Sequence, residues 1–272
     1  MCHSLSYRLS IALTCHGLLF AAPARSQTPT NDFQYYLLAP LKVHLLTAKN
    51  LPLIQTSLTQ TDFDRILAKI NLIWAQAGLH FYIQSIGQEE VNEPEKWANH
   101  GPPPEGINLL QLRPLGSLAT NAFHIYYLKK MSVNGIYFPE GIFVKDTAAL
   151  RDVEGGIDEP LPRVSSHELG HALGLSHRQN TTNLMASGTT GTWLNGEEIN
   201  QARNAARKLD WILPAPELIK TANTLFQRGK FSEAKTFYLR AAMLPLKADE
   251  VEVAKKRLAE ITHKGELNGN DY

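Results

Sequence analysis

The pattern of apolar and polar positions predicts a strand–helix–strand unit at the start of the globular part of the chain. Residues 41–48 alternate apolar with polar side chains, which is the period of a half-buried strand. Thr61 then begins a helix with Asp64 as its capping-box partner, and apolar residues recur at helical spacing until Gly78 ends it. Residues 79–86 form the next strand. A helix between two strands favours parallel pairing, so we expect these strands to be parallel with the helix on one face.

The middle of the chain predicts a surface excursion and then more sheet. Residues 87–118 are rich in proline, glycine and glutamate, and we expect a long loop with one short helix near residues 107–112. Residues 122–128 predict a third strand. Residues 137–138 and 142–144 flank a Pro-Glu-Gly turn and predict a hairpin.

Helices dominate the rest of the chain. Two prolines stand just ahead of a helix that Ser165 or Ser166 is predicted to cap. A further helix is predicted to begin at Asn195 or Gly196, with acidic residues near its positive end. Beyond Trp211 the pattern is helical throughout. The sequence therefore predicts an α+β fold followed by a small all-α module.

The same patterns divide the chain into four segments. Arg8 precedes a short apolar run that ends in small residues, which is typical of a secretory signal peptide over residues 1–26. The alternative interpretation is an apolar N-terminal helix that is retained. Residues 27–40 are predicted to be a linker, residues 41–211 the main domain, and residues 212–272 the helical module.

The charge balance and the cysteine positions indicate which kinds of partner and which cellular compartment to expect. The chain has 27 basic and 26 acidic residues, a net charge of +1, so nothing in it suggests a nucleic-acid partner. Its two cysteines, Cys2 and Cys15, both lie in the predicted leader, so the mature chain has no disulfide. No later segment is apolar enough to span a membrane. We expect a secreted protein, either extracellular or periplasmic.

The sequence HELGHALGLSH, which begins at His167, carries the candidate chemistry. His167 and His171 lie one helical turn apart, where two imidazoles can bind a single zinc ion. Glu168 can reach a water on that ion and act as a general base. Gly174 can adopt a positive φ and turn the chain so that His177 returns as the third ligand. Three protein ligands leave one position open for water, as a catalytic zinc site requires.

This motif resembles the signature of the metzincin zinc endopeptidases, in which HExxHxxGxxH is followed by a methionine-containing turn. The resemblance assigns that turn to the sequence NLMAS, with Met185 as an apolar floor beneath the zinc ligands. The spacing from His177 to Met185 is most similar to the matrixin branch. Arg178 and Ser187 depart from the named branches, and the chain has no cysteine-switch segment.

The resemblance covers roughly residues 40–211 and implies a mixed, twisted five-stranded sheet with an antiparallel edge strand over the cleft. The hairpin around residues 135–145 is expected to provide this strand and to hold a protein or peptide substrate by main-chain pairing. Thr192 and Trp193 would wall a substrate pocket, although Trp193 can equally be a core aromatic. The implied cofactor is one catalytic Zn²⁺. Calcium is without support, because the acidic loop at residues 152–159 is expected to be solvated.

The C-terminal module gives a second resemblance. Residues 217–245 are similar to a single tetratricopeptide repeat, with small residues such as Ala222 and Ala234 where two helices cross. A charged amphipathic helix is predicted at residues 249–261. Because one repeat cannot form a solenoid, two interpretations stay open. The module is either a hairpin packed on the main domain or a surface for a protein partner.

Two functions follow from these features. The first is a secreted zinc metalloendopeptidase in which His167, His171 and His177 bind zinc, Glu168 is the general base and Met185 supports the site. The second is a secreted binding protein without catalysis, which would use the helical module beside a protease-like domain. The presence of Glu168 and all three histidines favours the first.

Overall fold

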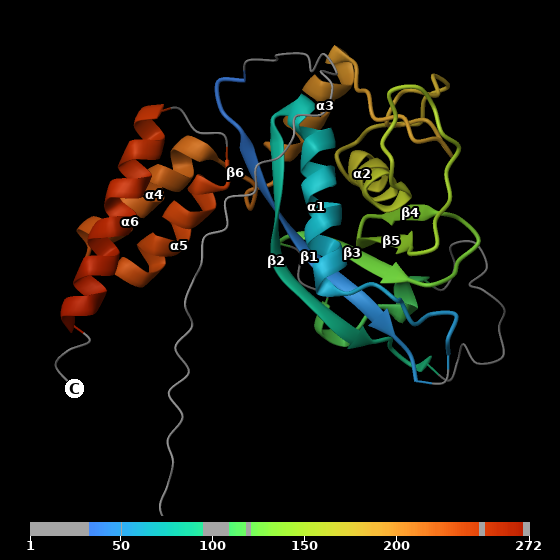
Figure 1. Ribbon diagram of the computed structural model, residues 1–272, viewed down its shortest axis with the longest axis horizontal. Coiled ribbons are helices and arrows are strands. Elements are labelled where there is room, and N and C mark those ends of the chain that lie inside the picture. Colours follow the sequence, from blue (N-terminus) through green and yellow to red (C-terminus); the bar gives the residue numbers. More distant parts are fainter. Residues whose placement is uncertain (1–32, 50, 95–108, 118–120, 245–247, 269–272) are drawn as a thin grey trace, which may run out of the picture.

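The computed structural model describes residues 33–49, 51–94, 109–117, 121–244 and 248–268. The signal peptide predicted for residues 1–26 lies outside these ranges. The described residues form a mixed α+β fold: a twisted, mostly parallel sheet with helices packed on it and a helical C-terminal module at one side (Figure 1). The α+β class predicted from the sequence is confirmed at this level.

The sheet has the strand order β2-β1-β3-β5-β4, and the short β6 pairs with the start of β1. The strands are β1 (Leu37–Thr47), β2 (Leu79–Glu90), β3 (Phe123–Leu128), β4 (Gly135–Phe138), β5 (Gly141–Lys145) and β6 (Leu213–Pro214). β1 is parallel to β2 and β3, and β3 is parallel to β5, whereas β4 is antiparallel to β5. The predicted parallel unit and the predicted hairpin are therefore both present, with β4 at the edge of the sheet.

The first two strands are longer than the sequence pattern predicted. β1 begins at Leu37, so the end of the predicted linker belongs to the sheet, and β2 runs on to Glu90, into the predicted loop. Residues 37–41 are all buried. A strand covered on both faces has no alternation of apolar and polar side chains, which is why the alternation rule missed its beginning.

Helix α1 (Gln60–Trp74) packs on one face of the sheet and ends in a single 3-10 turn before Gly78. Its capping box is formed by Thr59 and Asp62, not by Thr61 and Asp64. Both pairs have the Thr-x-x-Asp spacing. Capping by Thr59 lengthens the helix by two residues and leaves the same face buried. The local sequence pattern therefore does not decide between the two possible capping boxes.

Helix α2 (Pro160–Ala172) contains the histidine motif and begins earlier than predicted. Glu159 is its N-cap residue, so the prediction of Ser165 or Ser166 as the cap is wrong. Pro160 fits the first turn because the N–H that proline lacks has no helical partner there. Ser165 instead lies inside the helix, and its Oγ is 2.6 Å from the hydroxyl of Tyr127 on β3.

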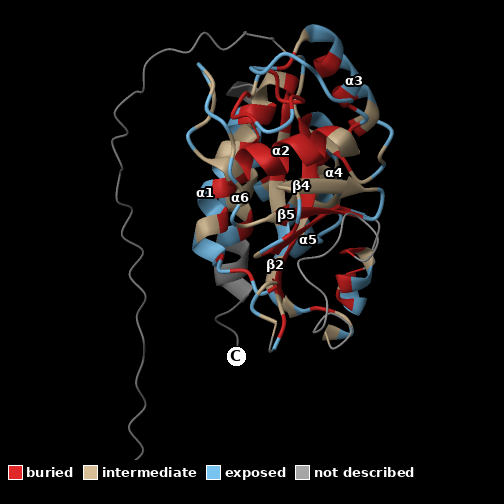
Figure 2. Ribbon diagram, turned by 90° about the vertical axis from the view of Figure 1, so that its right-hand side faces the viewer, coloured by how far each residue is buried: buried red, intermediate tan, exposed pale blue. Residues whose placement is uncertain are grey.

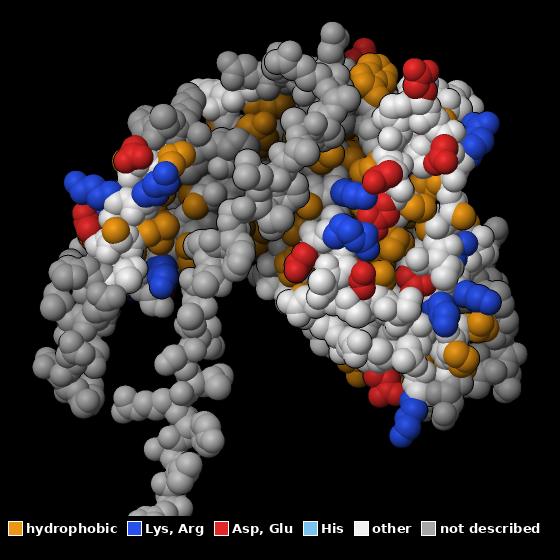
Figure 3. All heavy atoms as spheres, in the orientation of Figure 1, with side chains coloured by type: hydrophobic (Ala, Val, Ile, Leu, Met, Phe, Trp, Pro, Cys, Tyr) orange, Lys and Arg blue, Asp and Glu red, His pale blue; other side chains and the backbone are white. Residues whose placement is uncertain are grey.

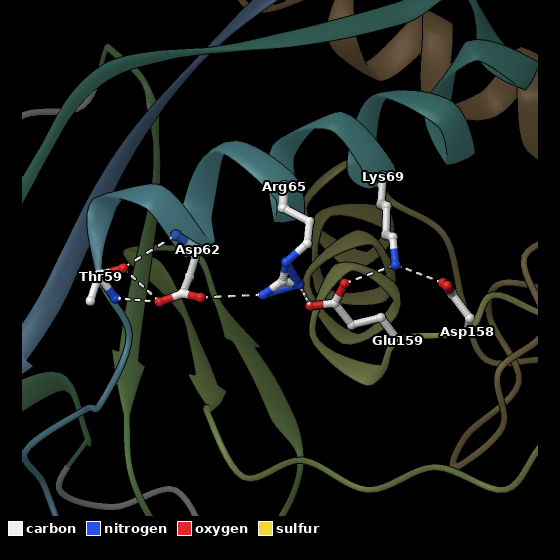
Figure 4. Close-up of polar contacts among 6 residues, drawn as sticks. All are labelled: Thr59, Asp62, Arg65, Lys69, Asp158 and Glu159. Carbon is white, nitrogen blue, oxygen red and sulfur yellow. Dashed lines mark hydrogen bonds and ion pairs between the residues drawn. The ribbon is translucent and has the colours of Figure 1, made fainter. Parts of the chain in front are cut away.

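Ion pairs fix the start of α2 to α1. Lys69 on α1 donates to Asp158 at 2.7 Å and to Glu159 at 2.9 Å, and Arg65 also binds Glu159 (Figure 4). Two carboxylates of the acidic loop are thus occupied by cationic side chains of a neighbouring helix. On the face seen in Figure 3, basic and acidic side chains are intermingled and do not gather into a patch of one sign.

The largest core lies between the sheet and helices α1, α2 and α3 (Gly196–Ala206), and Figure 2 shows α2 almost entirely buried at its centre. A second core covers the opposite face of the sheet, under a 3-10 turn at Leu109–Leu112. That turn coincides with the end of the short helix predicted near residues 107–112, and the residues before it lie outside the described ranges.

The C-terminal module comprises α4 (Ala215–Gln227), α5 (Phe231–Ala242) and α6 (Ala248–Asn268). Leu218 and Ala241 pack against Leu38 of β1 and Tyr82 of β2, so the module is docked on the sheet (Figure 1). None of the helices in the described part of the chain has both the length and the apolar character needed to cross a bilayer.

Candidate metal centre

The end of helix α2 turns the chain so that three histidines meet. Gly174 has φ +83° and follows the C-cap residue Leu173. The N–H of Leu175 donates to the carbonyl of Gly170 at 2.8 Å, and that of Gly174 donates to His171 at 2.9 Å, which is the Schellman arrangement. The reversal expected from the glycine is therefore present, and it brings the following segment back towards the helix.

Main-chain carbonyls set the tautomers of two of the histidines. Nδ1 of His167 lies 2.8 Å from the carbonyl oxygen of Leu184, and Nδ1 of His171 lies 2.8 Å from that of Leu175. Because a carbonyl oxygen only accepts, each Nδ1 must carry the proton and donate it. Both Nε2 atoms are then left with a free lone pair, which is the state required of a metal ligand.

These lone pairs converge on one point. Nε2 of His171 is 3.1 Å from Nε2 of His167 and 3.1 Å from Nε2 of His177, and the three residues form a candidate metal-binding group. Tetrahedral zinc with Zn–N bonds of about 2.0–2.1 Å separates its nitrogen ligands by roughly 3.3 Å. The donor set is therefore compatible with Zn²⁺.

Glu168 lies beside this group in a cleft of about 720 Å³, which is lined by α2, by β4 and by the chain around Ser187. Only 6% of Glu168 is exposed, and burial raises its pKa to about 8, while Arg163 acts in the opposite direction. A Cβ placed on Gly135 of β4 would lie 2.7 Å from Oε1 of Glu168. The edge strand thus approaches the carboxylate closely because it has a glycine at this point.

Met185 lies directly against the helix that carries the ligands. It is fully buried, and a Cβ placed on Gly170 would be 2.5 Å from its Sδ atom. Gly170 lies between the two helical histidines in the motif, so the absent side chain makes room for the methionine. The role of Met185 as a floor beneath zinc ligands stays a prediction.

A buried carboxylate joins the segments around the site. Glu198, which is 0% exposed, accepts from Arg178 Nε at 2.6 Å and from Asn183 Nδ2 at 2.8 Å. It also accepts from the main-chain N–H of Asn195 as part of the capping box of α3. Arg178 directly follows His177, so Glu198 links the third histidine, the loop of Met185 and α3. Sequence reasoning identified the acidic start of this helix but not its contact with the site.

Thr192 and Trp193 do not line the cleft that contains the three histidines. They line a separate shallow hollow together with Asn180 and Glu154, and 45% of Trp193 is exposed. The cleft is lined on this side by Ser187 and its neighbour Gly188 instead. The contribution of Thr192 and Trp193 to substrate binding therefore stays a prediction, and Trp193 is not a core aromatic.

The sequence matches no protein-family model, and no curated protein is significantly similar to it. Among solved structures, the chain is similar to a zinc-dependent peptidase from Methanocorpusculum labreanum. The two share 13% sequence identity with a TM-score of 0.28, over 60% of this chain and 98% of that one. At this level the likeness carries no argument, so the case for a function rests on the residues of the site.

Proposed function

We propose that this chain is a secreted zinc-dependent endopeptidase of the metzincin type, closest in its motif to the matrixins, acting on protein or peptide substrates. The observation that carries the proposal is the convergence of three imidazole Nε2 atoms beside a buried carboxylate within one cleft. The order of the motif residues and the buried Met185 support the metzincin assignment. The apolar leader in the sequence supports export, extracellular or periplasmic.

Each side chain has a distinct part in the proposed reaction. His167, His171 and His177 would hold the ion through Nε2. When bound, zinc supplies Lewis-acid activation of a water molecule and of the peptide carbonyl. Glu168 takes a proton from the attacking water and passes it to the leaving amine nitrogen. Its position suits this role, because the carboxylate lies in the same cleft as the three histidines, where the attacking water would bind.

The edge strand provides the substrate with a place to bind. Within the described residues β4 pairs with β5 on one side only, and residues 135–137 line the cleft next to Glu168. An extended peptide can add to such an edge by main-chain hydrogen bonds, which places its backbone across the site. This mode of binding favours cleavage within a chain over removal of single terminal residues.

The proposal is tested by separating zinc binding from cleavage. We expect the purified protein to hold about one zinc ion and to cut casein, with activity lost to a chelator and restored by zinc. Glu168→Gln should retain zinc but lose cleavage by at least ~10²-fold, because it cannot accept the proton. His171→Ala should lose both. Full cleavage by zinc-loaded Glu168→Gln would reject the assigned base, and a wild-type protein without affinity for zinc would reject the proposal.

The C-terminal module is proposed to serve mainly as a docked helical hairpin. The packing of Leu218 and Ala241 on the sheet supports this interpretation over that of a free module. The resemblance to a tetratricopeptide repeat stays a proposal, and with it the idea of a protein partner for these helices.

A further inference from the structure

A buried arginine lies beside the three histidines and lines the same cleft. Arg163 is on α2, one helical turn before His167, and only 2% of it is exposed. A guanidinium in the protein interior is costly unless its N–H groups find acceptors. The chemistry proposed above gives this residue no role, so its hydrogen bonds show what it does.

The guanidinium of Arg163 binds carbonyl groups of residues 183–191, which we call the Met185 loop. Nε donates to the carbonyl of Gly191 at 3.0 Å, and Nη2 donates to the carbonyls of Asn183, at 3.4 Å, and Ala186. These acceptors lie on both sides of Met185 and beyond the cleft-lining residue Gly188. One side chain therefore ties three points of the loop to the helix that carries the histidines.

The same contacts reach His167. Its Nδ1–H donates to the carbonyl of Leu184, which lies between two of the residues that bind Arg163. Nη1 of Arg163 is 3.2 Å from that Nδ1, but both groups are donors, so this approach is a packing contact and not a hydrogen bond. The carbonyl of Leu184 fixes both the tautomer and the orientation of the imidazole ring. Contacts that fix the position of residues 183–186 therefore also fix the orientation of Nε2 of His167.

We propose that Arg163 is a positioning residue of the metal centre, which docks the Met185 loop onto α2 and thereby orients His167 towards zinc. The inference rests on the zinc site proposed above. Arginine suits this task because its planar, forked donors reach several carbonyls at once, whereas lysine is a single point of charge on a flexible stem. Substitutions that disturb such outer partners of a metal ligand lower metal affinity or activity by about 10–100-fold.

The chain offers a matched control. Arg203 on α3 is also a buried arginine, 5% exposed, and donates to the carbonyls of Ala77 at 2.7 Å, Gly78 at 3.1 Å and Tyr35 at 3.1 Å. Its hydrogen bonds are to the 3-10 turn that follows α1 and to Tyr35 ahead of β1, not to the Met185 loop. Arg163→Lys and Arg203→Lys both remove hydrogen bonds to three carbonyls and keep the charge, and Arg203 also lies over the ring of Phe33 at 4.3 Å.

The experiment measures the zinc dissociation constant of the full chain by competition with a chromophoric chelator, and stability by urea unfolding without zinc. We expect both variants to be less stable than wild type, but only Arg163→Lys to bind zinc more weakly, by about 10–100-fold. An unchanged constant for Arg163→Lys, or an equal loss in both variants, would overturn the inference while leaving the zinc peptidase proposal intact. A wild-type protein that binds no zinc would instead reject the proposed function.

The zinc affinity of Arg163→Lys can still be measured if this variant does not fold without zinc. If Arg163→Lys is unfolded without zinc, the midpoint of refolding on zinc titration reports the affinity, because an ion that binds only the folded state stabilises it by mass action. Arg163→Gln, which also lacks the forked donors of arginine, should then bind zinc more weakly than wild type as well. A glutamine variant that binds zinc as tightly as wild type would again contradict the inference.

Discussion

At the residue scale, the proposed metal centre depends on three places where a side chain is absent. Gly174 supplies the positive φ that reverses the chain before His177. Gly170 leaves room for Met185, and Gly135 leaves room for Glu168. Gly174 is required for its backbone conformation, whereas Gly170 and Gly135 are required because a Cβ would collide with a neighbouring side chain. The geometry of the site therefore depends on these glycines as well as on the histidines and Glu168.

Gly135→Ala tests the steric requirement at the carboxylate. The added methyl group would lie 2.7 Å from Oε1 of Glu168 and 2.6 Å from Cγ1 of Val164, so the carboxylate has to move. A displacement of about 1 Å in a reacting group can cost ~10²-fold in rate, and we expect kcat for casein peptides to fall by that order with zinc content unchanged. Gly116→Ala is the control, because nothing lies within 4 Å of its added Cβ. Equal rates for both variants would contradict the prediction.

At the scale of elements, a chain of hydrogen bonds crosses three strands on the sheet face away from α2. His44 on β1 has Nδ1 2.9 Å from a carboxylate oxygen of Glu89 on β2, and Nε2 2.9 Å from Nδ1 of His124 on β3. The His44 ring is stacked 4.4 Å from that of Tyr126. Since the carboxylate accepts from Nδ1 of His44, Nε2 must in turn accept from His124. This network satisfies a neutral, buried imidazole within the second core.

Acid should destabilise the protein through this network. Burial lowers the pKa of His44, with Lys42 acting in the same direction and Glu89 against it. The unfolded chain therefore binds a proton more readily than the folded one. His44 contributes to the free energy of unfolding above the unfolded pKa of about 6.5, and this contribution is lost as the pH falls below that value. Urea unfolding with chelator present should show a steeper loss from pH 7.5 to 5.5 in wild type than in His44→Gln. Parallel curves would exclude this role.

At the scale of the whole molecule, the C-terminal helices extend the fold of the main domain. β6 pairs with the start of β1, and α4 follows it without a break, so the module is joined to the sheet by main-chain pairing as well as by packing. Leu38 on β1 belongs to the shared cluster and is 2% exposed. The two parts are therefore expected to unfold together.

Leu218→Ala tests this coupling, because Leu218 is 1% exposed within the shared cluster. Removing a buried leucine typically costs about 2–5 kcal/mol. We expect a loss of that size in the free energy of unfolding, with a single transition followed by both tryptophan fluorescence and circular dichroism. Leu239→Ala on α5, where the side chain is 46% exposed, should change stability by less than ~0.5 kcal/mol. Two separate transitions would show instead that the module folds independently.

The sequence by itself determined the features that depend on local spacing. The strand–helix–strand unit, the hairpin at 135–145 and the helix carrying the histidines follow from periods of two and 3.6 residues. The meeting of His167, His171 and His177 followed from helical geometry and the freedom of Gly174. Local rules failed where two local solutions compete, as at the caps of α1 and α2, and where burial on both faces removes alternation, as in β1.

Only the tertiary structure decided which distant groups surround those histidines. The sequence pattern left Arg163 in the loop ahead of the predicted helix and placed Glu198 only among the acidic residues near the start of another helix. Their partners come from loops that no short-range pattern places. The same holds for Gly135 against Glu168 and for Thr192 and Trp193, which lie in a hollow of their own. The spacing of the three histidines is set by the backbone of one helix and the turn that follows it. The residues that hold these histidines in place come from separate elements, so they depend on tertiary packing.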